Sequence, residues 1–458
     1  MNDAGRGGGG GGGGGRRRCS GEAQIHRNSS SSSSSSKESG FALVSLHHNP
    51  GSGCCFSKRH AAAGGRPLLQ PHAGEPPKEE GARMPAVGGS DEGQAPPGAA
   101  PSPKPARSSG RPPSRREGGP RPLLRWDEVP DDFVECFILS GYRRLHCTAQ
   151  ECLASVLQPT NETLNFWTHF VPLLLFAAKF CRLLLLRGAG DVPFHHPALL
   201  PLWCYASGVL LTFAMSCTAH VFSCLSLRLR AAFFYLDYAS ISYYGFASTV
   251  AYYYYLLPGL SLLEPRALSR YLQQRLGWHV DCSAPLAAYS ALVLPVAFAL
   301  AVACTVACCK SRSEFCAYPF AIRTFVFVMP LSMACPIMLE SLLFDLQGHN
   351  PTLFVHFYRR YFWLLVAAFF NVSKIPERIQ PGLFDIIGHS HQLFHIFTFL
   401  SIYDQLFYVE EGLQQFLQGH TPALPTFAGT VGYMLLLILC LGLVIRRFLN
   451  VPEACKHD

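Results

Sequence analysis

Apolar residues fill long, nearly unbroken stretches in the second two-thirds of this chain, and polar residues gather in the segments between them. Each stretch has close to the ~20 residues that an α-helix needs to cross the hydrocarbon core of a bilayer. A backbone surrounded by lipid must satisfy its hydrogen bonds within its own segment, so helices are the expected structure. The predicted membrane spans are 167–186, 199–223, 231–257, 285–309, 320–344, 353–372, 386–408 and 426–448.

The flanking sequence has a different character. Residues 1–120 are runs of Gly, Ser, Pro and Arg that cannot bury enough apolar surface to offset the entropy of ordering, so they predict a disordered leader. Residues 121–166 mix apolar and charged positions at helical spacing and predict an amphipathic segment beside the membrane. The bundle itself is predicted over 167–449, and residues 450–458 form a short tail. We therefore expect an all-α integral membrane protein.

Composition and charge agree with a membrane protein and indicate its orientation. The 458 residues are 49% hydrophobic and only 15% charged, whereas soluble domains carry about 25% charged residues. The net charge of +8 lies largely in the leader and in short loops, which argues against a nucleic-acid-binding surface. Lys and Arg in alternate loops place the N terminus, the leader and the tail in the cytoplasm. The loop after the third span does not fit this orientation, because it lies on the opposite side and carries Arg266, Arg270 and Arg275.

Ionisable residues interrupt the apolar spans, where such groups are costly and indicate function. With the N terminus inside, four of them share one depth near the cytoplasmic face: His220, Asp237, His391 and His395. His391 and His395 are four residues apart, so both rings project from one face of a helix. These two imidazoles and a third from another helix can fill three of the four positions around Zn²⁺, which leaves the fourth for water. Ser216 lies one helical turn before His220 on the same face.

The same region also permits a purely structural interpretation. Histidines inside helical bundles often serve as hydrogen-bonded packing residues, and we interpret His389 in that way. We expect Glu162, Asn165 and His169 to cap and brace the start of the first span.

Two adjacent arginines, Arg359 and Arg360, lie in the outer part of the sixth span. Long basic side chains near a helix end usually snorkel, which means that the aliphatic stem stays in lipid while the charge reaches the headgroups. We expect both arginines to snorkel, and an acidic partner such as Glu340 is the alternative.

Three sequence patterns carry a family resemblance. They are "ILSGYRRL" (138–145), "NETLNFWTH" (161–169) and the five positions Ser216, His220, Asp237, His391 and His395. Together they resemble the progestin and adipoQ receptor family over about residues 125–449, and the eighth span is similar to its membrane progestin receptor branch. The resemblance implies an adiponectin-receptor-like seven-helix bundle plus an eighth C-terminal transmembrane helix, with the N terminus in the cytoplasm.

The resemblance also implies a zinc site and a function. Zinc would be bound by His220, His391 and His395, Asp237 would act through the bound water, and Ser216 would orient that water or a substrate carbonyl. The implied function is a plasma-membrane receptor for progestogen-type steroids that signals through G proteins. One alternative is a zinc-dependent intramembrane hydrolase of a lipid amide such as ceramide, and another is a zinc ion with a structural role only.

Overall fold

The computed structural model of the chain describes residues 122–183, 192–313, 319–344, 351–419 and 424–450. Within these residues the regular structure is helical, apart from one isolated bridge between Leu124 and Tyr142. The predicted leader, residues 1–120, and residues 451–458 of the predicted tail lie outside the described residues. The prediction of an all-α protein is confirmed.

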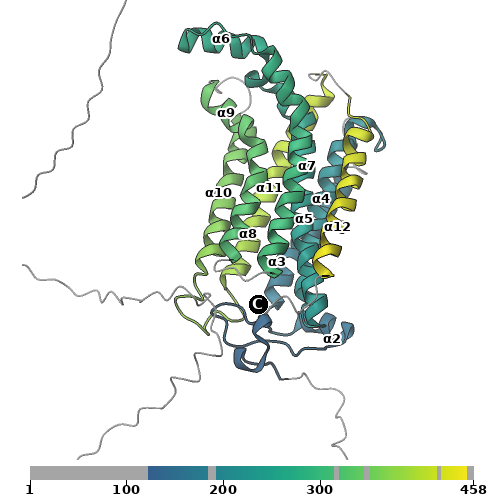
Figure 1. Cartoon of the computed structure of the whole chain (residues 1–458), viewed down its shortest axis with the longest axis vertical. Coiled ribbons are helices and arrows are strands. Elements are labelled where there is room, and N and C mark those ends of the chain that lie inside the picture. The colour runs from purple at the N-terminus through teal and green to yellow at the C-terminus, as the bar shows by residue number, and fades with distance from the viewer. Residues whose placement is uncertain (1–121, 184–191, 314–318, 345–350, 420–423, 451–458) are drawn as a thin grey trace, which may run out of the picture. The chain divides into compact units, whose positions relative to one another are not determined.

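The described bundle consists of seven long helices and one interrupted helix (Figure 1). The long helices are α3 (Thr163–Cys181), α4 (Leu200–Phe222), α5 (Leu227–Tyr255), α7 (Ser283–Ser313), α10 (Pro351–Ser373), α11 (Ser390–Leu417) and α12 (Tyr433–Leu449). The interrupted helix is α8 (Pro319–Val328), η8 (Met329–Ala334) and α9 (Cys335–Leu343). Six of these segments are long and apolar enough to cross a membrane, all but α5 and α11. The protein is an integral membrane protein of the helical class, as predicted.

Helices α5 and α11 have 29 and 28 residues, so they also have the length of a membrane span. They carry more polar residues than the other six segments, and they correspond to the third and seventh predicted spans. Helix α5 packs against α4, α7, α11 and α12, and α11 packs against α3, α5 and α10. Their polar side chains therefore have neighbouring helices rather than lipid to contact, which is where polar groups in membrane helices are tolerated.

Several helix boundaries differ from the predicted spans. Helix α3 begins at Thr163 and not near 167, and α11 runs to Leu417 and not to 408. Hydrophobicity marks only the part of a helix that meets lipid, whereas the hydrogen-bonded helix continues into polar sequence at its ends. The extra turn of α3 matters, because it brings Asn165 and the adjacent Glu162 into the bundle.

The fifth predicted span is not one continuous α-helix. Between α8 and α9 the chain narrows into the 3₁₀ segment η8, which contains Pro330, and α9 has Pro336 in its first turn. Proline has no backbone N–H and clashes with the preceding turn, so it interrupts an α-helix. This segment packs against α5 and α7 and contributes to the wall of the cavity described below.

The structure contains a helix that the hydrophobicity pattern did not predict. Helix α6 (Pro265–Leu276) carries Arg266, Arg270 and Arg275, and it ends at Gly277 with a left-handed backbone conformation (φ 69°). It lies at the end of the bundle opposite α2 (Ala149–Ala154) (Figure 1). The three arginines that do not follow the alternation of basic loops are therefore part of a short helix.

Helices α4 and α5 approach each other closely at Gly208. A Cβ atom at this position would lie 2.8 Å from the Cβ of Ala247 and 3.0 Å from the Cα of Tyr244. Small residues at helix contacts allow such close approach in membranes, where packing drives association. The contact fixes α4, which carries His220, against α5, which carries Asp237.

Candidate metal centre

Three histidines that are far apart in the sequence meet at one point. His220 lies in the last turn of α4, while His391 and His395 lie in the first two turns of α11. One ring nitrogen from each histidine lies within 4.8 Å of the corresponding nitrogen of the other two. His220 and His395 are buried, and His391 is partly buried. The structure thus brings together the three residues that the sequence singled out as metal ligands.

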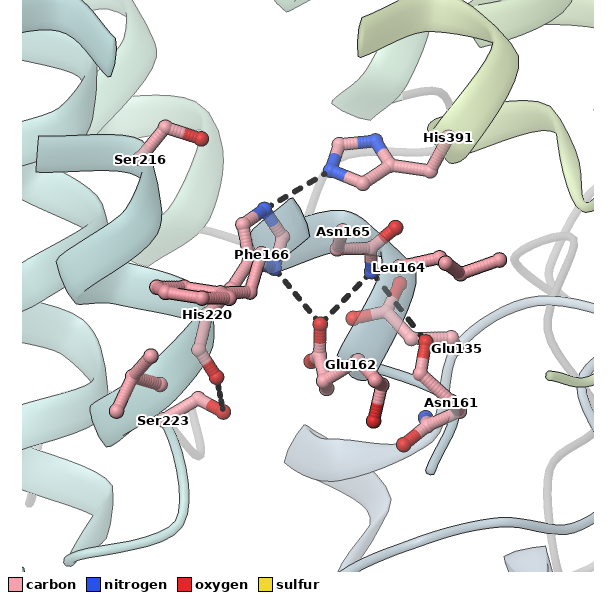
Figure 2. A network of polar contacts seen from close by, with 12 residues as sticks. Glu135, Asn161, Glu162, Leu164, Asn165, Phe166, Ser216, His220, Ser223 and His391 are labelled. Atoms are coloured by element: carbon pink, nitrogen blue, oxygen red, sulfur yellow. Dashed lines mark hydrogen bonds and ion pairs between the residues drawn. The ribbon is translucent and has the colours of Figure 1, made fainter. Parts of the chain in front are cut away.

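The spacing of these nitrogens suits a tetrahedral metal ion. The Nε2 atoms of His391 and His220 are 3.4 Å apart (Figure 2). Tetrahedral zinc binds imidazole at about 2.0–2.1 Å, which puts two ligand nitrogens about 3.4 Å apart. All three side chains are imidazoles, a donor type that zinc readily accepts. The residues present therefore fit a zinc ion without a change of backbone.

Other side chains hold two of the rings by their second nitrogen. Nδ1 of His220 lies 2.7 Å from Oε2 of Glu162, which also accepts a 2.8 Å hydrogen bond from Nδ2 of Asn165 (Figure 2). Nδ1 of His395 lies 3.1 Å from the carbonyl oxygen of Asn165 and 3.0 Å from the hydroxyl of Thr168. Hydrogen bonds at Nδ1 fix the ring orientation and leave Nε2 free to bind a metal, the arrangement typical of protein zinc sites.

Glu162 is the main residue that sequence reasoning misjudged. It was expected to brace the first span, and it does bond Asn165, but it also contacts His220 on another helix. Burial opposes ionisation of Glu162, yet His220, Arg143 and Arg230 favour the carboxylate more strongly, so its pKa lies below the ordinary value. One sequence signal could have indicated this contact: Glu162 is an acidic residue at the predicted depth of the histidines.

A partly buried arginine supports the end of α4 next to the site. Arg143 donates hydrogen bonds to the carbonyl oxygens of His220 and Val221, at 2.5 and 2.8 Å, and to the hydroxyls of Ser155 and Ser223, both at 2.9 Å. The last carbonyl groups of a helix lack partners within the helix and carry partial negative charge, which a guanidinium neutralises. Arg143 therefore fixes the turn from which His220 projects.

The start of α11 is held in a similar way. Glu377, which is buried, accepts hydrogen bonds from the backbone N–H and the hydroxyl of Ser390, the first residue of the helix. Nε2 of His389 lies 3.2 Å from the carbonyl oxygen of Asn161. Burial lowers the pKa of His389 to about 4, so this ring is neutral at pH 7 and can donate that bond. His389 is engaged in packing contacts and is not part of the three-histidine group.

Ser216 contacts a fourth histidine. Its hydroxyl lies 2.7 Å from Nδ1 of His169, whose ring stacks on that of His395 with centroids 3.6 Å apart. Nε2 of His169 is buried and has no hydrogen-bond partner in the described part of the chain. The structure therefore links Ser216 to the site through His169, a residue that sequence reasoning assigned only to bracing the first span.

Asp237 faces the same cavity as the histidines but is separate from the ligand group. It lies on α5 and lines the cavity together with His220 and His391. Among the described residues, its carboxylate does not join the three nitrogens that lie within 4.8 Å of one another. Asp237 is thus placed where a carboxylate can act on a molecule inside the cavity.

The site opens into a cavity of about 1290 Å³ between the helices. One part of it contains the histidines, and its wall continues along α5, α10 and α11 to Tyr252, Arg360 and Ile402. The upper range for small-molecule sites in proteins is about 1,000 Å³. The cavity is therefore large enough for an apolar molecule that reaches from the histidines into the bundle.

Comparison with known proteins identifies the class. Residues 157–406 match a family model described as "Haemolysin-III related". The chain belongs to this family of helical integral membrane proteins, and the resemblance to progestin and adipoQ receptors is confirmed.

The chain is similar to several membrane progestin receptors. It is 34% identical to membrane progestin receptor gamma-A of Danio rerio over 313 residues, which cover 67% of this chain and 87% of that protein. It is 34% identical to membrane progestin receptor delta of Homo sapiens over 347 residues, which cover 73% and 93%. It is 29% identical to membrane progestin receptor alpha of Sus scrofa over 352 residues, which cover 73% and 91%.

Proposed function

We propose that this protein is a plasma-membrane receptor that binds progestogen-type steroids between its helices and signals through G proteins. The observation that carries this proposal is the similarity to membrane progestin receptors over most of the length of both chains. The cavity supports it, because a steroid needs a concave, mostly apolar site with a few polar groups.

Ligand binding tests the receptor proposal directly. Membranes from cells that express the full chain should show saturable binding of labelled progesterone, which unlabelled progesterone displaces. Membranes from untransfected cells provide the baseline. Progesterone-dependent loading of a G protein with a labelled GTP analogue, in the same membranes, tests the signalling step. Binding no higher than the baseline would reject the steroid receptor, and binding without GTP-analogue loading would reject the G-protein step alone.

We also propose that His220, His391 and His395 hold a zinc ion. The supporting observations are the 3.4 Å separation of the Nε2 atoms of His220 and His391 and the 2.7 Å contact that holds Nδ1 of His220 to Glu162. Purified protein should contain about one zinc per chain, and replacement of His391 by alanine should remove it. The matched control is His279→Ala, which changes an exposed histidine outside the site. A wild-type protein that contains no stoichiometric metal when folded would refute the proposal.

A second candidate function is hydrolysis of a lipid amide. It is favoured by Asp237, which lines the cavity beside the histidines and could accept or deliver a proton during the reaction. Zinc, when bound, polarises a carbonyl group and lowers the pKa of water. Ceramide is the substrate to test, with sphingosine release as the measurement. Equal release by wild-type protein and the His391→Ala variant would exclude this mechanism.

A structural role for zinc predicts a different result. If the ion only ties α4 to α11, its removal should lower the melting temperature of the bundle. The measurement is a thermal melt in detergent with and without a strong chelator. A large shift without any effect of metal on ceramide hydrolysis would favour the structural role.

We propose that the N terminus faces the cytoplasm, so that the histidine site lies near the cytoplasmic face. The support is the excess of Lys and Arg in alternate loops. An N-terminal epitope tag should be accessible to antibody only after the plasma membrane is permeabilised. A tag that is accessible on intact cells would reverse the orientation.

A further inference from the structure

Arg360 is a buried cation in the interior of the bundle. The sequence predicts that Arg359 and Arg360 both snorkel, or that Glu340 pairs with them. In the structure Arg359 is 53% exposed and lies 3.5 Å from Asp404. Arg360 is only 4% exposed, so the snorkelling prediction is wrong for this residue. Glu340 instead accepts hydrogen bonds from the backbone N–H groups of residues 261 and 262.

Two tyrosines hold the Arg360 guanidinium in place. Nη1 donates to the hydroxyl of Tyr252 on α5 and to that of Tyr408 on α11. The two hydroxyls lie 2.8 Å apart, and Nε2 of Gln405 also donates to Tyr252. Each hydroxyl oxygen has two lone pairs. The four contacts therefore use every acceptor site that the two tyrosines offer.

The cluster of Arg360, Tyr252, Tyr408 and Gln405 has more hydrogen-bond donors than acceptors. Nε of Arg360 is buried and has no hydrogen-bond partner in the described part of the chain. No carboxylate of the described residues lies within ion-pair distance of this guanidinium. An arginine keeps its charge at any physiological pH. A buried cation whose N–H donors lack acceptors is costly in a membrane. We therefore expect a hydrogen-bond acceptor from a bound molecule at this position.

Arg360 lines the same cavity as the histidines. Along α11, Tyr408 lies thirteen residues beyond His395, which corresponds to about 20 Å at 1.5 Å per residue. Between these levels, Thr398 and Ser401 line the cavity, and their buried hydroxyls have no partner among the described residues. The cavity thus has one polar end at the histidines, a second at Arg360 and unpaired hydroxyls between them.

We propose that Arg360 binds an acceptor oxygen of the ligand, a keto or carboxylate oxygen, at the end of the cavity remote from the histidines. Tyr252 and Tyr408 position the guanidinium, and its unpartnered Nε–H donates to the ligand. The ligand is then an elongated apolar molecule with an oxygen at the end that lies near Arg360. If the ligand is a steroid, this inference rests on the proposed receptor function. Arg360 is then the residue whose hydrogen bond orients the steroid in the cavity.

Binding of labelled progesterone to membranes that contain the full chain tests the proposal. Arg360→Met keeps a long side chain and removes the donors, and it should weaken binding about 10- to 100-fold, the range for a hydrogen bond to a charged group. Arg359→Met is the matched control, because Arg359 is adjacent in sequence but exposed, and this variant should bind normally. Arg360→Lys keeps the charge but loses the fork of donors, and it should show an intermediate loss with a normal melting temperature.

Two progesterone analogues, each without one of the two keto oxygens, identify the contact. Wild-type protein should lose affinity for one analogue, and Arg360→Met should bind that analogue and progesterone equally well. Unchanged binding by both Arg360 variants, or the same loss for every analogue, would overturn the proposal. If Arg360→Met fails to fold, as judged by its melting temperature, the comparison of analogues is made with Arg360→Lys.

Labelled palmitate separates failure of this inference from failure of the receptor function. If wild-type protein binds no progesterone, the receptor proposal fails. Palmitate binding then tests only whether Arg360 binds an acceptor oxygen of a ligand. Saturable palmitate binding that Arg360→Met abolishes would support the acceptor site with a carboxylate ligand. Palmitate binding that does not depend on Arg360, or no saturable binding of either probe, would overturn the inference.

Discussion

Replacement of Glu162 by glutamine should weaken metal binding while the fold is preserved. The side chain keeps its size, but the hydrogen bond to Nδ1 of His220 loses its charged acceptor. This bond is 2.7 Å long and joins two buried side chains, so water screens it little. A hydrogen bond to a charged group contributes about 1.5–3 kcal/mol. If the whole of this contribution favours the metal-bound orientation, zinc affinity falls about 10- to 100-fold.

The assay is competition for zinc between the purified protein and a chelator of known affinity. Glu264→Gln is the control, because Glu264 is exposed next to α6 and remote from the histidines. Circular dichroism and melting temperature establish that each variant is folded. A competition curve for Glu162→Gln that matches wild type, in a folded protein, would refute the claim that Glu162 orients His220 for a metal. The size of the expected loss agrees with that found when such outer ligand partners are mutated.

Three further predictions concern stability and pH. Ser216→Ala should lower the melting temperature in detergent by several degrees, because the buried Nδ1 of His169 loses its 2.7 Å partner at a cost of about 1–3 kcal/mol; an unchanged melt would contradict the bond. Gly208→Ala should destabilise the bundle by about 1–3 kcal/mol, since the new Cβ would meet Ala247 at 2.8 Å. Gly442→Ala, where nothing lies within 4 Å, should not destabilise it, and equal melts for the two glycine variants would dispute the close contact. Zinc retention, measured by metal analysis after dialysis, should fall as the pH is lowered, because histidine ligands bind metal only when deprotonated. Retention that stays constant down to the pH at which the bundle unfolds would argue against histidine ligation.

Much of the site could be predicted from the sequence because of where its ionisable residues occur. His220, His391 and His395 stand out in apolar surroundings, and loop charges order the helices so that these residues share a depth. The four-residue spacing of His391 and His395 then fixes their common face. The predicted meeting of α4 and α11 is what the structure shows.

The residues that support the site could not be assigned in the same way. Glu162 and His169 lie where polar residues normally cap a helix, so their local environment explains them without a distant partner. Their contacts with His220 and Ser216 depend on how α3 packs against α4, which no local pattern encodes. A helix such as α6 was missed for a related reason, because its arginines are typical of an exposed loop as well as of an exposed helix.

Arg359 and Arg360 show the limit of sequence reasoning most clearly. Adjacent residues on a helix point about 100° apart, so one can face the bundle while the other faces outward. The sequence contains no signal for which arginine does which, because both have the same neighbours and the same charge. Only the positions of Tyr252 and Tyr408, from two other helices, distinguish them.

The contact between Arg143 and the end of α4 makes the segment before α3 part of the structure that supports the three histidines. A single guanidinium connects residue 143 to the carbonyl of His220. A truncated protein that starts at α3 would leave the last turn of α4 uncapped, with His220 free to tilt. A functional form of this protein therefore includes its juxtamembrane residues, and a force or a partner acting on that segment would be transmitted to His220 through Arg143 and Glu162.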